Sequence, residues 1–130
     1  MSSAIFKTKF RDAHVSPAQL TPPTFQSLTL RSSHLVLITG PSEGGIGAET
    51  AISLAHGNPA LLILVGRTLS KIQPTIDTVH AVNPSIAVTF ITADLTSLNS
   101  VREAAREILN DASITHIDVI INNAAVMASP

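Results

Sequence analysis

Short apolar runs alternate with longer mixed segments along most of the chain, from residue 35 onward. The apolar runs are typical of β-strands, which we expect at Leu35 to Thr39, Leu61 to Val65, Ala87 to Thr92 and Ile117 to Asn122. The mixed segments carry apolar residues at helical spacing, so we expect helices at Ile46 to His56, Ser70 to Val82 and about Ser97 to Asn110. The pattern is a regular succession of strand and helix.

The third helical segment has the clearest amphipathic pattern. Serine is a favoured N-cap, and Ser97 stands directly before the segment. We expect Ser97 to cap this helix, and its apolar stripe to face a sheet. That stripe consists of Leu98, Val101, Ala105, Ile108 and Leu109.

The strand from Leu61 to Val65 is apolar throughout, which is typical of a strand buried on both faces of a parallel sheet. Strands that alternate with helices imply right-handed crossovers. The sequence therefore predicts an α/β fold, a Rossmann-type open parallel sheet with helices on both faces. With about four strands and three helices, this version of the fold is incomplete.

Residues 1–33 show no sustained strand or helix period, and Pro17, Pro22 and Pro23 interrupt them. We expect an extended or disordered N-terminal arm at 1–33. Residues 34–130 then form one domain of Rossmann type that is truncated after the fourth strand.

Composition narrows the possible partners. The chain has 130 residues, 45% of them hydrophobic, and a formal net charge of −1, which gives no basic field for nucleic acid or a membrane surface. It has no cysteine, and its five histidines lack metal-ligand spacing, so we expect no disulfide and no metal site. A cytoplasmic location fits; the alternative is mitochondrial, because Lys7, Lys9 and Arg11 precede the first acidic residue.

A glycine-rich turn stands between the first strand and the first helix. Glycine lets the backbone leave a strand at angles closed to other residues and lets amides approach a phosphate closely. The turn predicts a dinucleotide site at the N-terminus of the helix, with a tight surface turn as the alternative. Its candidate binding residues are Gly40, Ser42, Gly44, Gly45, Ile46 and Gly47.

The same turn argues against a nucleoside triphosphate site. Gly40 and Gly45 have the spacing of a P-loop, in which Lys and then Ser or Thr must follow. Ile46 and Gly47 follow instead. Without that lysine, no side chain of the motif neutralises a triphosphate.

The end of the second strand selects between the two nicotinamide cofactors. An acid there binds the ribose hydroxyls of NAD, whereas a cation binds the 2′-phosphate of NADP. Arg67 stands at this position, and no acid accompanies it. We therefore expect NADP in preference to NAD, with a solvated strand-end arginine as the alternative.

Two further candidates follow the third and fourth strands. Asp94 and Leu95 could border an adenine, although Asp94 could equally form a turn ahead of Thr96. Asn122, Asn123 and Ala124 close the fourth strand, where amide side chains can join neighbouring loops and small residues leave room for a ribose.

Together these motifs resemble the short-chain dehydrogenase/reductase family in kind, order and separation, over about residues 35–128. The resemblance implies that the glycine turn holds the pyrophosphate, Arg67 marks NADP preference, Asp94 and Leu95 border the adenine, and the Asn122 motif borders the ribose. It also implies hydride transfer to a carbonyl or from an alcohol.

The chain departs from the family pattern at three points. Its glycine turn has one residue more than Thr-Gly-x-x-x-Gly-x-Gly, so Gly44 or Gly45 is the additional residue. Ala125 replaces the glycine that closes the fourth motif. The family's catalytic serine, tyrosine and lysine have no matching position, and the chain contains no tyrosine. We therefore expect an NADP-binding portion that is inactive by itself.

The alternative is a non-enzymatic nucleotide-binding or interaction module. An apolar fourth strand at an open sheet edge offers unpaired backbone groups. Such an edge could pair with a full-length relative.

Overall fold

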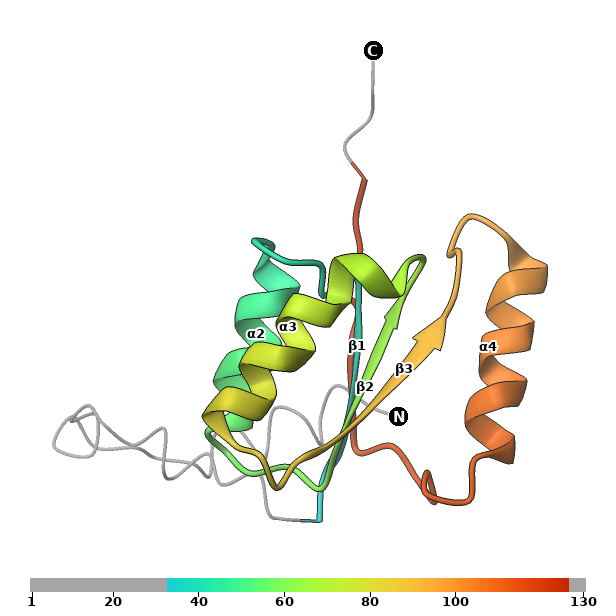
Figure 1. The fold of residues 1–130 in the computed structure, drawn as a ribbon. Coiled ribbons are helices and arrows are strands. Elements are labelled where there is room, and N and C mark those ends of the chain that lie inside the picture. The colour runs from blue at the N-terminus through green and yellow to red at the C-terminus, as the bar shows by residue number, and fades with distance from the viewer. Residues whose placement is uncertain (1–32, 127–130) are drawn as a thin grey trace, which may run out of the picture.

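In the computed structural model, the described part of the chain is residues 33–126. Figure 1 shows a parallel sheet with helices against both of its faces. The elements are β1 (Leu35–Thr39), α2 (Ile46–Ala55), β2 (Leu61–Gly66), α3 (Leu69–Val82), β3 (Ala87–Thr92), α4 (Leu98–Asn110) and β4 (Val119–Ile121). The predicted α/β fold is confirmed. Apart from Ser33, the predicted N-terminal arm lies outside the described residues.

The sheet has the strand order β3-β2-β1-β4, and every neighbouring pair is parallel. The chain moves from β1 outward to β3 and then returns to the other side of β1 to form β4. Beside β1 the strand order therefore reverses, and a ligand crevice forms there at the carboxyl ends of the strands in folds of this type.

Each face of the sheet has its own hydrophobic core. In Figure 1, α2 and α3 cover the left face and α4 covers the right face. Side chains alternate along each strand, so consecutive residues of β1 point to opposite faces. The face beneath α2 and α3 includes Val36, Ile38, Leu62 and Leu64. The face beneath α4 includes Leu35, Leu37, Ile63 and Val65.

Small residues allow α2 to lie close to the sheet. Its buried positions are Gly47, Ala48, Ala51 and Ala55, which recur every three or four residues on one side of the helix. None of these side chains extends beyond a Cβ, so the start of the helix comes directly against the end of β1.

The start of α4 agrees with the predicted cap. The Ser97 hydroxyl accepts a hydrogen bond of 3.3 Å from the Ser100 amide. This bond satisfies one of the amides that a helix start leaves without a partner.

The predicted apolar stripe of α4 is only partly correct. Val101 and Ile108 are half-buried, but Ala105 is exposed, and its neighbour Ala104 is buried instead. Leu98 is 72% and Leu109 82% exposed. The helix lies against β3, and a helix that contacts one strand buries only a narrow ridge.

The fourth strand is shorter than the predicted run from Ile117 to Asn122. The Asp118 amide donates to the Leu35 carbonyl at 2.9 Å, and the Asp118 carboxylate accepts from the Leu35 amide at 2.8 Å. The Leu35 amide is therefore bonded to the Asp118 side chain and not to a backbone carbonyl of the fourth strand. The regular pairing with β1 begins only at Val119. The hydrogen bond from the Leu35 amide holds the pKa of Asp118 below its usual range, and His116 at 3.1 Å adds to the effect.

No helix within the described residues is long and apolar enough to cross a membrane. Within residues 33–126, no group of three or more metal-ligating side chains is placed to hold a metal ion.

Candidate functional site

The glycine turn leaves β1 at the point where the strand order reverses. Gly40 has a φ of +69°, in the left-handed region that favours glycine, and its amide donates to the Val65 carbonyl at 2.8 Å. A Cβ on Gly40 would lie 3.0 Å from the backbone and the side chain of Ala124. The first glycine of the turn therefore brings the loops after β1 and β4 together.

The turn ends at the start of α2, where several amides remain free. Gly45 is the N-cap of the helix. Because glycine has no side chain, it makes no side-chain capping hydrogen bond. Among the described residues, no acceptor lies within hydrogen-bond distance of the amides of Ser42, Gly44, Ile46 and Gly47. Free amides at a helix N-terminus, together with the helix dipole, favour an anion.

Asn123 and Thr39 tie the loop after β4 to the glycine turn. The Asn123 side-chain amide donates to the carbonyls of Thr39 at 3.1 Å and Gly40 at 3.2 Å. The Thr39 hydroxyl accepts from the Asn123 amide at 3.1 Å and the Ala124 amide at 3.0 Å. These four bonds fix one side of the turn.

Helix α3 holds the other side of the turn. Thr75 is buried and its hydroxyl donates to the Pro41 carbonyl at 3.0 Å. The Glu43 amide donates to the Lys71 carbonyl, also at 3.0 Å. Sequence reasoning missed Thr75, because a threonine inside a helix carries no sign of a partner 34 residues away.

Arg67 follows β2 directly and is exposed at the same edge of the sheet. No carboxylate among the described residues lies within salt-bridge distance of its guanidinium. An unpaired guanidinium can bind a phosphate with two parallel hydrogen bonds. Arg67 is thus exposed at the sheet edge with its guanidinium unpaired among the described residues, and binding of an NADP 2′-phosphate requires both features.

Asp94 forms a turn with Thr96, which is one of the two roles that the sequence suggests for it. Its carboxylate accepts from the Thr96 hydroxyl at 2.7 Å and the Thr96 amide at 3.0 Å. These bonds hold the pKa of Asp94 below its usual range, and Arg67 contributes a smaller lowering. Leu95, which follows, is 48% exposed. The turn leaves room for contact with a ligand, since Asp94 is at the sheet edge.

The candidate residues share one edge but spread across its width. The glycine turn, Asn122, Asn123 and Ala124 stand at the ends of β1 and β4, whereas Arg67 follows β2 and Asp94 follows β3. Asn122 is exposed and makes no hydrogen bond to the described part of the chain. A ligand that contacted all of them would have to be elongated.

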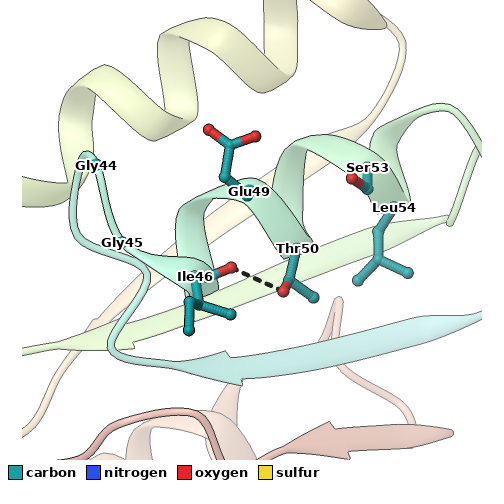
Figure 2. Close-up of a pocket in the computed structure, with 7 residues that line it drawn as sticks. All are labelled: Gly44, Gly45, Ile46, Glu49, Thr50, Ser53 and Leu54. Carbon is teal, nitrogen blue, oxygen red and sulfur yellow. Dashed lines mark hydrogen bonds between the residues drawn. The ribbon is translucent and has the colours of Figure 1, made fainter.

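An open groove runs from the glycine turn along the outer side of α2 (Figure 2). The exposed side chain of Ile46 stands at its start and Leu54 near its end. The Thr50 hydroxyl donates to the Ile46 carbonyl at 2.8 Å, so it is used within the helix. The groove offers apolar contact next to the free amides.

A family model described as short chain dehydrogenase matches residues 34–130. The chain belongs to the short-chain dehydrogenase family. The resemblance expected from the motifs is therefore confirmed, and the fold agrees with it.

The similar proteins include one NADPH-dependent and one NADH-dependent reductase. Oxidoreductase fscI of Fusarium equiseti is 38% identical over 99 residues, which cover 76% of this chain and 38% of the relative. The structure of YwfH, an NADPH dependent reductase involved in bacilysin biosynthesis, matches with a TM-score of 0.64 at 23% identity, over 74% of this chain and 36% of that one. The structure of the NADH-dependent reductase A1-R′, complexed with NAD, matches with a TM-score of 0.56 at 25% identity. The match covers 69% of this chain and 35% of that one.

The chain spans less than two fifths of the length of each of these three proteins. The matched part contains the glycine turn and every other candidate residue.

Proposed function

We propose that this chain is the NADP-binding portion of an oxidoreductase that acts on carbonyl or alcohol substrates. The observation that carries the proposal is the set of free amides at the start of α2, beside the point where the strand order reverses. Pyrophosphate is the part of a dinucleotide that such amides recognise. When bound, the nicotinamide gives or takes a hydride.

The binding residues divide by their place along the sheet edge. The turn would hold the pyrophosphate, Arg67 the 2′-phosphate, Asp94 and Leu95 the adenine, and the loop after β4 the nicotinamide-side ribose. The proposed set is Gly40, Ser42, Gly44, Gly45, Ile46, Gly47, Arg67, Asp94, Leu95, Asn122, Asn123 and Ala124.

Gly44 is the additional residue of the turn in this proposal. Gly45 caps α2 and Gly47 packs against Asn123, so these two match the last glycines of the family pattern. Gly44 has a φ of +74° and open space around its Cα. A residue at such a position lengthens the loop without displacing the helix.

The preference for NADP rests on Arg67, because the solved relatives include both an NADPH-dependent and an NADH-dependent enzyme. An exposed arginine without a carboxylate partner favours the cofactor that carries an extra phosphate.

We expect the purified chain to bind NADPH and to catalyse no redox reaction alone. Its 130 residues contain no tyrosine to serve as the family's proton donor. NADPH fluorescence measures binding directly, since the chain has no tryptophan to interfere. A panel of aldehydes, ketones and alcohols, followed by NADPH absorbance, measures turnover. Absence of NADPH binding would contradict the proposed cofactor role, and turnover with any panel member would contradict the expected inactivity.

A second candidate function is pairing through the outer edge of β4, where no other strand of residues 33–126 lies. Val119 is 38% and Ile120 59% exposed on this strand. The Asp118 amide points toward β1, and strand amides alternate in direction, so the Val119 amide points to the open edge. Such an edge can accept a strand from a full-length family member.

Val119→Pro tests this pairing, because proline removes the outward amide and leaves the β1 ladder intact. Size-exclusion chromatography of the chain mixed with a full-length family member should show a joint peak that Val119→Pro abolishes. Separate elution of the unmodified chain at all concentrations would rule the pairing out.

A further inference from the structure

Thr75 differs from the other helical threonines near the site. Thr50 and Thr78 each donate to the carbonyl four residues earlier in their own helix, at 2.8 Å and 2.9 Å. Helical threonines commonly make this local bond. Thr75 instead donates to Pro41, in the glycine turn, at 3.0 Å.

The carbonyl four residues before Thr75 is also used by the turn. It belongs to Lys71 and accepts a 3.0 Å bond from the Glu43 amide. Two contacts one helical turn apart therefore join α3 to the segment between Pro41 and Glu43.

Both partners of the Thr75 hydrogen bond are buried, so its loss would be costly. Thr75 is 2% exposed and Pro41 is fully buried, so water cannot replace either partner. A proline has no amide, and its carbonyl is its only backbone polar group. A buried carbonyl without a donor is costly, so this contact restricts where the turn can lie.

We propose that Thr75 is a positioning residue for the dinucleotide, acting through the glycine turn. It holds the lengthened turn against α3 so that the free amides of Ser42 and Gly44 face the ligand before it arrives. A longer loop has more conformations to lose on binding, and a fixed contact reduces that loss. This inference rests on the proposed cofactor role.

The test compares Thr75→Val with Thr75→Ser and Thr78→Val. Valine keeps the shape of threonine and removes the hydroxyl, whereas serine keeps the hydroxyl. Thr78→Val is the matched control, since it removes the same group from the same helix where the bond stays within the helix.

We expect Thr75→Val to raise the Kd for NADPH about three- to tenfold, the range that loss of one ordinary hydrogen bond gives. Amide hydrogen exchange of Glu43 and Gly45, the two turn residues whose amides are hydrogen-bonded, should also become faster in this variant. Thr75→Ser should restore both values, and Thr78→Val should change neither.

Unchanged exchange and unchanged affinity in Thr75→Val would overturn the positioning role while leaving the proposed cofactor role intact. Equal effects of Thr78→Val would overturn it too, since the loss would then reflect helix stability alone. If the unmodified chain bound neither NADPH nor NADH, the cofactor role would fail, and with it the positioning of a dinucleotide by Thr75. The exchange rates would then still show whether Thr75 holds the turn.

Discussion

Gly47→Ala is expected to abolish NADPH binding and to lower the free energy of unfolding by about 1–3 kcal/mol, as overpacking in a close-packed interior does. A Cβ on Gly47 would collide with the Asn123 side chain and lie 3.0 Å from the Gly40 carbonyl. To make room, Asn123 would have to leave the carbonyls that it joins. Urea denaturation followed by circular dichroism measures stability, and NADPH fluorescence measures binding.

Gly44→Ala is the matched control for this substitution. Gly44 also belongs to the turn, but an added Cβ there meets no atom. Its positive φ makes alanine less favourable by about 1–2 kcal/mol, without a collision. We expect Gly44→Ala to keep binding NADPH. If Gly47→Ala bound as well as the unmodified chain, the close approach of α2 to Asn123 would have no part in cofactor binding.

Arg67→Glu is expected to weaken NADPH binding about 10- to 100-fold, because it removes charge-assisted hydrogen bonds and places a carboxylate near the 2′-phosphate. NADH lacks that phosphate, so its affinity should be unchanged or improved. Parallel titrations with both cofactors measure the ratio of the two affinities.

Arg106→Glu makes the same charge change on the exposed surface of α4, distant in sequence from the turn. It controls for the overall charge of the chain, and we expect it to leave the ratio unchanged. An unaltered NADPH affinity in Arg67→Glu would show that Arg67 is a solvated arginine without a role in cofactor choice.

The sequence predicted the interior of the fold well because the two central strands, β1 and β2, consist almost entirely of apolar residues. The run from Leu61 to Val65 is typical of a strand buried on both faces, and the structure buries all five residues. The errors lie at the edges. β4 begins later than predicted because the Asp118 side chain takes the Leu35 amide, a contact between residues 83 positions apart.

The candidate site was predictable where backbone conformation demands a residue type. Gly40 and Gly44 both have positive φ, and their positions followed from glycine content and spacing. The amide side chains after the fourth strand were expected to join neighbouring loops, and Asn123 does so. The Thr75 contact was not predictable, because its bond reaches a carbonyl 34 residues away. Of the two roles expected for Asp94, the structure confirms the turn with Thr96, and contact with an adenine stays a prediction.

Amide NMR of the 15N-labelled chain, titrated with NADPH, tests most directly whether the glycine turn holds the pyrophosphate. The free amides of Ser42, Gly44, Ile46 and Gly47 should shift together and saturate at the concentration at which NADPH fluorescence saturates. Saturation of the fluorescence while these four amides stay unmoved would contradict the account.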